Sequence, residues 1–307
     1  MSPGERVMKR WFPSSTANHR DGSLPIAASP GSALPFVFAG VVAAALAWST
    51  VAGATPRPLP FTYTYDTLGE GESEVEQYVD LTPVKAIDPT GKPVWYTASQ
   101  FQMEFEHGIT DRLELGLYAA FLPGAPEGYT DTATLTEGTG FKERLRLRIA
   151  EEGEWPIDLA LYGELVEYTT EFEIEAKVIL QKRFGKLRIA ANAWAEREYY
   201  YAVNQQDWVL NPTVGATYQV TPSFHAGVEY WMRVEFPDPA PNPRPFSLGP
   251  NQFVGPALMF SFGHLWWSTG IYARVNDVTR AAQPTNANQP SDNFGPIWAR
   301  TVIGLEL

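Results

Sequence analysis

Residues 101–121 read FQMEFEHGITDRLELGLYAAF, and apolar and polar side chains alternate along most of this stretch. The apolar residues on one face are Phe101, Met103, Phe105, Leu113, Leu115 and Leu117. Alternation with a period of two is typical of a β-strand, and Gly-Ile-Thr-Asp at 108–111 is typical of a tight turn. The stretch therefore predicts a β-hairpin with one apolar face and one polar, mostly charged face.

Two environments are compatible with such a hairpin. In a soluble antiparallel sheet, the apolar face packs on a core and the polar face meets water. In an outer-membrane barrel, the apolar face meets lipid and the polar face meets a wet lumen. The hairpin alone does not distinguish these environments, so the choice depends on the rest of the chain.

The remainder of the chain repeats the alternation, and no helical stretch interrupts it. The predicted strands are about twelve in number, as in an even-numbered barrel, and cover 73–82, 94–107, 112–121, 141–149, 157–169, 171–183, 187–200, 208–220, 224–235, 251–262, 265–276 and 296–307. Short turns are expected at 108–111, 151–156, 184–186, 221–223 and 263–264. Longer connections are expected at 83–93, 122–138, 201–207, 236–250 and 277–295.

This rhythm of short and long connections favours the membrane environment. Outer-membrane barrels have short periplasmic turns, longer extracellular loops and strands of about ten residues. An open sheet edge would leave unpaired backbone groups in hydrocarbon, so the sheet must close. The sequence therefore predicts an all-β fold, a closed antiparallel up-and-down transmembrane β-barrel over residues 73–307. Pro212 and Pro256 fall inside predicted strands, and a bulge or strand boundary is expected at each.

The N-terminus has the layout of a secretory signal peptide. Arg6, Lys9 and Arg10 precede an apolar run at 33–48, and Ala-Gly-Ala at 52–54 is a small-residue cleavage site. The alternative is a single membrane anchor, but the run of 16 residues is shorter than the roughly 20 residues that a span needs. We expect residues 1–54 to be a signal peptide with an N-terminal extension. Residues 55–72 are then a periplasmic lead-in, with a short extended piece at 61–65.

Composition narrows the function classes further. The chain of 307 residues has no cysteine, which excludes disulfides, cysteine metal sites and a lipid-modified N-terminal cysteine. The formal charge of -12 makes nucleic acid a poor partner. The mean hydropathy of -0.21 does not indicate a helical membrane protein. Because no nucleotide-binding loop and no cysteine or histidine metal spacing is present, we expect no cofactor and no metal.

Taken together, these features resemble the Gram-negative outer-membrane β-barrels, in particular porins and transporters, over residues 55–307. The resemblance implies location in the cell outer membrane, contact with its lipid, and recognition of the C-terminal strand by the barrel assembly machinery. Leu305 and Leu307 match the hydrophobic positions of that strand's signal, with leucine in place of the usual terminal aromatic residue. Aromatic residues near strand ends suit girdles at the two membrane interfaces, the alternative being core aromatics: Trp95, Tyr96, Tyr118, Tyr199, Tyr200, Tyr201, Trp208, Tyr230, Trp231, Trp266 and Trp267.

In such a barrel the polar faces of the strands line the lumen. The predicted basic residues form a row on one strand: Lys142, Arg144, Arg146 and Arg148. The predicted acidic residues are Glu104, Glu106, Glu114, Glu171, Glu173 and Glu175, and further lumen residues are Arg112, Glu229, Arg233, Arg274 and Arg300. A charge-lined channel would screen small polar or charged solutes, and the basic row could guide an anion, although the acidic surplus argues for cations. The alternative is a lumen closed by salt bridges, whose long loops contact an external partner.

An outer-membrane hydrolase is the remaining alternative. It needs a nucleophile and a base within reach of each other on the outward face. The histidines of the mature chain are His107, His225 and His264, and Ser223 is the serine nearest to His225 in sequence. Since none of these forms a recognisable catalytic arrangement, we expect the protein not to be an enzyme.

Overall fold

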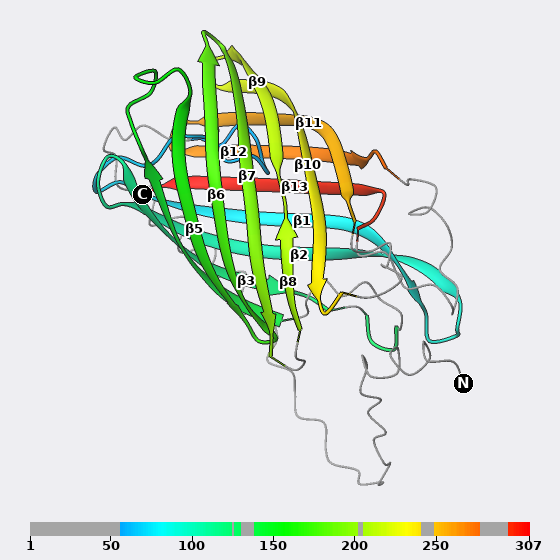
Figure 1. Ribbon diagram of the computed structural model, residues 1–307. Coiled ribbons are helices and arrows are strands. Elements are labelled where there is room, and N and C mark those ends of the chain that lie inside the picture. Colours follow the sequence, from blue (N-terminus) through cyan, green and yellow to red (C-terminus); the bar gives the residue numbers. More distant parts are fainter. Residues whose placement is uncertain (1–55, 125, 130–137, 202–204, 241–248, 277–293) are drawn as a thin grey trace, which may run out of the picture. The chain divides into compact units, whose positions relative to one another are not determined.

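The computed structural model describes residues 56–124, 126–129, 138–201, 205–240, 249–276 and 294–307. The predicted signal peptide over 1–54 lies outside the described residues. The described residues build an antiparallel sheet that is closed on itself (Figure 1). Among them, no helix is long and apolar enough to cross a membrane.

The sheet contains thirteen strand segments. They are β1 (Ser73–Ile87), β2 (Pro93–Gly108), β3 (Leu113–Leu122), β4 (Gly138–Arg148), β5 (Asp158–Tyr168), β6 (Glu171–Phe184), β7 (Leu187–Tyr200), β8 (Gln205–Leu210), β9 (Thr213–Thr221), β10 (Phe224–Asp238), β11 (Asn251–Phe262), β12 (Leu265–Arg274) and β13 (Ile297–Glu306). Both β8 and β9 lie between β7 and β10 and pair with each of them. The two segments therefore make up one interrupted strand, and the barrel has twelve strands.

The two strand prolines behave differently. Asn211 and Pro212 separate β8 from β9, which confirms the strand boundary expected there. Pro256 remains inside β11, where it pairs with Val228 of β10. On its other side, the paired positions of β11 and β12 pass from Val254 to Ala257. Because proline has no backbone N–H, this interruption of the ladder is the expected result.

Closure joins the first strand to the last. β1 pairs with β13 from Glu74 opposite Glu306 to Leu81 opposite Ala299, and these strands lie side by side in cyan and red in Figure 1. The backbone N–H of Leu307 also donates to the carbonyl of Ser73 at 3.0 Å. Closure satisfies the backbone groups that an open edge would leave unpaired. The predicted closed antiparallel barrel is therefore confirmed.

The connections follow the predicted rhythm only at one end of the barrel. There, the turns are short, as at 185–186, 222–223 and 263–264. At the other end, β1 continues to Ile87 and reaches β2 through residues 88–92, so the predicted long connection at 83–93 is wrong. Pro83 interrupts the sequence pattern but pairs in register with Thr97, so the strand runs through it. The predicted connections at 122–138, 236–250 and 277–295 lie partly outside the described residues.

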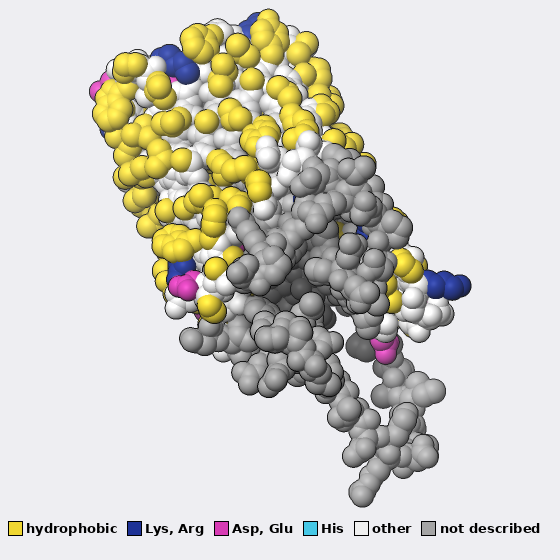
Figure 2. Space-filling model, turned by 45° about the vertical axis from the view of Figure 1, so that its right-hand side comes forward, with side chains coloured by type: hydrophobic (Ala, Val, Ile, Leu, Met, Phe, Trp, Pro, Cys, Tyr) yellow, Lys and Arg dark blue, Asp and Glu magenta, His cyan; other side chains and the backbone are white. Residues whose placement is uncertain are grey.

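The two faces of the strands have opposite chemistry. On β2, Phe101, Met103 and Phe105 are 36%, 46% and 39% exposed, whereas Gln102, Glu104 and Glu106 are buried. Figure 2 shows hydrophobic side chains spread over the outer wall, with charged side chains near the strand ends. Apolar side chains outside and charged side chains inside are the reverse of a soluble protein. The apolar face of the opening hairpin thus points outward rather than into a core.

The aromatic residues divide between the two faces. Trp95, Trp208 and Trp267 are exposed on the outer surface, as a girdle requires. Tyr118 and Trp231 are instead buried, and Trp266 is fully buried with its indole N–H donating to Glu74 Oε1 at 2.5 Å. The girdle prediction therefore fails for these three residues, because proximity to a strand end does not reveal which face a side chain occupies.

Candidate functional site: the barrel lumen

Residues 57–68, RPLPFTYTYDTL, lie inside the barrel and are called the plug segment below. Leu59, Phe61, Tyr63, Tyr65 and Leu68 are all buried, the most exposed of them by only 7%. The sequence-based expectation put this stretch in a periplasmic lead-in, so the structure places it differently. From Leu59 to Tyr65, large apolar or aromatic residues alternate with prolines and threonines, and these smaller residues are buried as well.

The backbone of the plug segment is bound by side chains of the barrel wall. A strand inside a barrel has no neighbouring strand to satisfy its N–H groups, so these need other partners. The N–H of Phe61 donates to Glu229 Oε1 at 3.0 Å, and that of Thr62 donates to the same oxygen. Further acceptors are Asn192 for Tyr63 (2.8 Å), Gln181 for Tyr65 (3.2 Å) and Glu114 for Leu68 (2.7 Å).

The plug segment folds back on itself within the lumen. Leu68 lies beside Glu114 near the start of β3, at the end of the barrel with the short turns. Phe61 contacts Tyr272 and Trp298, and Arg57 returns to Glu76 (3.1 Å), with its guanidinium 4.0 Å from the centre of the Tyr63 ring. The segment therefore forms a loop with its apex near Phe61.

One wall of the lumen carries a compact group of charges, the arginine cluster, made of Arg144, Arg146, Glu104, Glu106 and Glu114. Arg144 bonds to Glu104 at 2.7 Å, to Glu114 at 2.6 Å and also to Glu106, while Arg146 bonds to Glu114 at 2.6 Å. Buried charges need such pairing. A side chain at Gly116 would place its Cβ 2.6 Å from both Arg144 Nε and Glu104 Oε1, so glycine leaves the space that the cluster fills.

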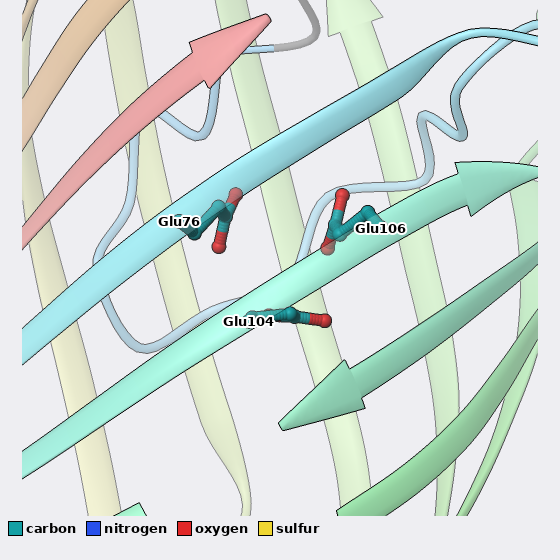
Figure 3. Close-up of side chains that lie close together, drawn as sticks. All are labelled: Glu76, Glu104 and Glu106. Atoms are coloured by element: carbon teal, nitrogen blue, oxygen red, sulfur yellow. The ribbon is translucent and has the colours of Figure 1, made fainter. Parts of the chain in front are cut away.

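Three carboxylates beside this cluster are close enough together to hold a metal ion. Oxygens of Glu76, Glu104 and Glu106, from β1 and β2, lie within 4.8 Å of one another (Figure 3). Arg57 already pairs with Glu76, and Arg144 pairs with Glu104 and Glu106. Guanidinium groups thus supply the positive charge that these carboxylates require, and we assign no metal to them.

The other predicted lumen residues are also largely paired. Lys142 pairs with Glu164 (3.3 Å), Arg300 with Asp80 (2.7 Å), and Arg233 with Glu196 (3.0 Å) and Glu198 (2.7 Å). The remaining residues are placed as follows: Glu171, Glu175, Glu229 and Arg274 are buried, Glu173 and Arg148 are half-buried, Glu175 pairs with Lys177, and Arg274 donates to the carbonyl of Phe294. Arg112 differs, since it lies in an exposed turn and pairs with Glu151 at 2.8 Å.

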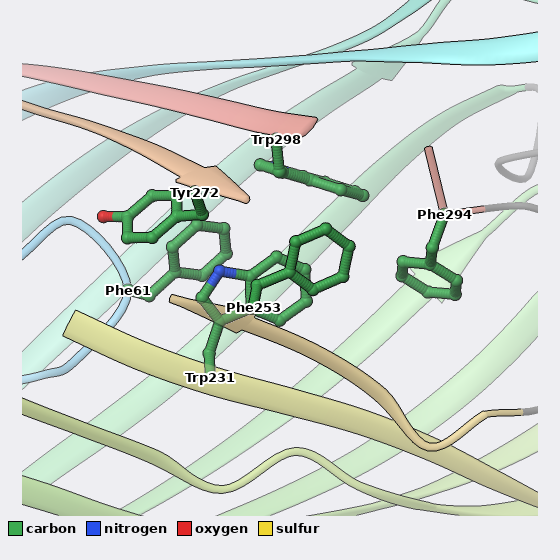
Figure 4. Close-up of a cluster of buried hydrophobic side chains, with 6 residues drawn as sticks. All are labelled: Phe61, Trp231, Phe253, Tyr272, Phe294 and Trp298. Atoms are coloured by element: carbon green, nitrogen blue, oxygen red, sulfur yellow. The ribbon is translucent and has the colours of Figure 1, made fainter. Parts of the chain in front are cut away.

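A second group on the lumen face is aromatic and is called the aromatic cluster. It consists of Phe61, Trp231, Phe253, Tyr272, Phe294 and Trp298 (Figure 4). Phe61 stacks on Trp231 with ring centres 4.6 Å apart and meets Tyr272 edge-on at 5.1 Å. Sequence reasoning assigned Trp231 to an aromatic girdle and named only charged residues for the lumen. The partner that unites the cluster, Phe61, comes from the plug segment and left no local signal.

The histidines lie at the edge of the barrel rather than in the lumen clusters. His107 Nδ1 lies 2.8 Å from Ser73 Oγ, and His264 Nδ1 lies 3.1 Å from Glu306 Oε2. The Nδ1 atom of His225 is buried without a hydrogen-bond partner in the described part of the chain. Within the described part of the chain, a serine–histidine contact thus joins β1 to β2, and sequence proximity did not reveal it.

Solved structures show what this barrel is similar to. An outer-membrane channel from Pseudomonas putida F1 gives a TM-score of 0.55 at 11% identity, over 79% of this chain and 98% of the channel. The KdgM porin in complex with disordered oligogalacturonate gives 0.47 at 6% identity, over 76% and 99%. The NanC porin gives 0.44 at 8% identity, over 75% and 100%. The chain has the fold of an outer-membrane channel.

The likeness to this outer-membrane channel fold is one of architecture. At 11% identity, the similarity to the Pseudomonas channel concerns the path of the chain and not its solute. No protein-family model and no curated protein matches the sequence. The function must therefore be argued from the lumen itself.

Proposed function

We propose that this protein is an outer-membrane channel for small polar or charged solutes, and that the plug segment closes it. The outward apolar side chains supply the lipid contact, as on Phe101 and Met103 of β2. The inward charged side chains supply the wall of the pathway. Transport requires the plug segment to move, because it lies in the lumen between these walls.

The main observation behind the proposal is that the plug segment lies inside the lumen. Eight-stranded barrels are filled by their own side chains, and barrels of about 16–18 strands leave an aqueous channel. This barrel of twelve strands lies between them and is occupied by a peptide of its own chain. The peptide is attached through side chains such as Glu229 and Asn192, so it can leave without breaking a strand pairing.

The charges of the lumen favour cations over anions. Among the described residues, fifteen acidic and six basic side chains are buried. The predicted basic row provides no anion pathway, because Arg144 and Arg146 are bound to glutamates and Lys142 to Glu164. The acidic surplus attracts cations into the pathway.

Planar-bilayer recordings of the purified full chain test the proposal. We expect brief openings in potassium chloride, and a reversal potential in a salt gradient that shows preference for potassium. Absence of openings, together with absence of solute flux into liposomes, would overturn the channel function. Openings with a preference for chloride would overturn the charge argument while leaving the channel function intact.

Export and assembly complete the proposal. We infer that a signal peptide over residues 1–54 is cleaved during export, and that β13 is recognised by the barrel assembly machinery. The support for the second inference is that β13 closes the barrel against β1. N-terminal sequencing of protein from outer membranes is expected to begin at Thr55, and a start upstream of that residue would contradict the inferred cleavage site.

The hydrolase alternative depends on the contact between Ser73 and His107. In a serine triad, the nucleophile bonds to Nε2 of histidine and the acid bonds to Nδ1. Here the serine lies 2.8 Å from Nδ1, so the ring is turned the other way. We therefore propose that this pair ties β1 to β2 without hydrolytic activity, and Ser73→Ala is expected to leave any lipid or peptide hydrolysis at background.

A further inference from the structure

The ring of Phe61 occupies a site that is built by the barrel wall. It lies between the indole of Trp231, at 4.6 Å between ring centres, and the guanidinium of Arg300, at 3.8 Å from its own centre. Tyr272 closes one edge at 5.1 Å. A guanidinium and an indole on opposite faces are a strong combination for an aromatic ring, since both stacking and cation–π attraction act on it.

A carboxylate lies at the side of this ring and binds the backbone that carries it. Glu229 is 1% exposed, and its Oε1 accepts the N–H groups of Phe61 and Thr62. Its Oε2 accepts the hydroxyl of Tyr272 at 2.5 Å. When the plug segment leaves, Oε1 loses both donors. A buried carboxylate oxygen without a donor is unfavourable, so Oε1 of the empty site calls for a replacement donor.

The charge of the site selects which donor fits best. Arg300 is neutralised by Asp80, with contacts of 2.7 and 2.9 Å, so it faces the ring without leaving a net charge. Among the described residues, Glu229 accepts from two backbone N–H groups and one tyrosine hydroxyl, all of them uncharged. The site as a whole therefore carries one unbalanced negative charge, which an ammonium group would compensate.

We propose that Phe61 occupies the channel's own solute site, and that the solute class is an aromatic ring carrying an ammonium group one short arm away. Such a solute places its ring between Trp231 and Arg300 and its ammonium on Glu229. It competes with Phe61 and thereby displaces the plug segment. This inference rests on the proposed channel function and names its solute and its opening signal.

The probe is 2-phenylethylammonium, with two matched controls. Cyclohexylethylammonium keeps the charge and the arm but lacks the aromatic face, and 3-phenylpropanoate keeps the ring but reverses the charge. Binding to the purified full chain is measured by isothermal titration calorimetry. Phe61→Ala removes the internal competitor, and Phe105→Ala removes an outward aromatic residue as its control. Glu229→Gln is tested in the Phe61→Ala background.

We expect Phe61→Ala to bind the probe about tenfold more tightly than the wild type, a change of about 1.4 kcal/mol. Phe105→Ala should match the wild type, and Glu229→Gln should abolish the preference for the ammonium over the carboxylate. Equal binding of the cyclohexyl control, or no gain from Phe61→Ala, would overturn the inference. If Phe61→Ala does not fold, Leu59→Ala, which loosens the segment at Gly215, takes its place with the same expected gain.

Conductance separates failure of this inference from failure of the channel function. Openings in potassium chloride that are insensitive to the probe would reject the aromatic ammonium and leave the channel in place. Probe binding without openings in any variant would reject the channel and leave a binding site. With both correct, the probe increases the opening frequency of the wild type at low concentration, and cyclohexylethylammonium does not.

Discussion

The arginine cluster and the aromatic cluster both consist of side chains that point into the lumen, but their partners come from different parts of the chain. In the arginine cluster, Arg144 on β4 binds glutamates of β2 and β3, so the barrel wall pairs its own charges. In the aromatic cluster, Trp231 and Tyr272 receive their central partner, Phe61, from the plug segment. The first cluster braces the wall and binds the plug segment through one hydrogen bond, from Leu68 to Glu114, whereas the second is built around a residue of that segment. We infer that stability resides mainly in the first and gating in the second.

The largest expected effect comes from breaking the bracing cluster. Arg144→Met leaves Glu104, Glu106 and Glu114 without their shared partner. Removing one member of a buried ion pair destabilises a protein by about 3–5 kcal/mol. Urea unfolding in lipid vesicles measures the loss. Arg112→Ala, which removes a pair exposed on the surface, is the control and should cost far less. Equal losses in the two variants would show that the cluster does not brace the wall.

A smaller effect is expected from a substitution that displaces the plug segment. A Cβ at Gly215 would lie 2.6 Å from Leu59 Cδ1, so Gly215→Val forces the plug segment away from β9. Overpacking typically costs about 1–3 kcal/mol, which corresponds to an increase of roughly 5- to 150-fold in the open fraction. Single-channel recordings count the openings. Gly163→Val is the matched control, since no atom lies within 4 Å of a Cβ there. An increase in both variants would mean that the barrel, rather than the plug segment, had changed.

Glu229→Gln is a milder change, which weakens the hydrogen bonds of the plug segment without displacing it. The amide keeps an acceptor for Phe61 and Thr62 but loses the charge that strengthens both bonds. Hydrogen bonds to charged groups contribute about 1.5–3 kcal/mol and neutral ones about 0.5–1.5 kcal/mol, so an increase of about fivefold in openings is expected. The loss in urea unfolding should be far smaller than in Arg144→Met. A large loss of stability would place Glu229 among the bracing residues instead.

The smallest effect lies outside both clusters, in the turn between β1 and β2. The Asp88 carboxylate accepts the backbone N–H of Lys92 at 2.9 Å and that of Thr90 at 2.8 Å, and these bonds lower its pKa below the usual range. A lowered pKa contributes stability above the unfolded pKa of about 3.9, and this contribution is lost as pH falls through the folded value. The protection of the Lys92 amide against hydrogen exchange, relative to the intrinsic rate at the same pH, should therefore fall at low pH. In Asp88→Asn this protection should already be reduced at neutral pH, and unchanged protection in that variant would contradict the assignment.

The outward and inward faces of the strands could be predicted from the sequence because alternation fixes them locally. Phe105 and Glu104 are on the predicted sides, and the lumen row of Arg144 and Arg146 follows from the same pattern. The ion pairs between these arginines and the glutamates could not be predicted, because alternation does not tell which glutamate lies opposite which arginine. The position of the plug segment was hidden for a different reason. Its contacts, such as Phe61 with Glu229, join residues 168 positions apart.

Crosslinking the plug segment to the wall tests the central claim most directly. Asp66 of the segment pairs with Arg188 of β7 at 2.6 Å, and the chain has no cysteine to interfere. In Asp66→Cys/Arg188→Cys, a short bis-methanethiosulfonate is expected to join the two thiols and stop the openings in planar bilayers. A reducing agent should restore them. Openings that continue unchanged after complete crosslinking would contradict closure of the lumen by residues 57–68.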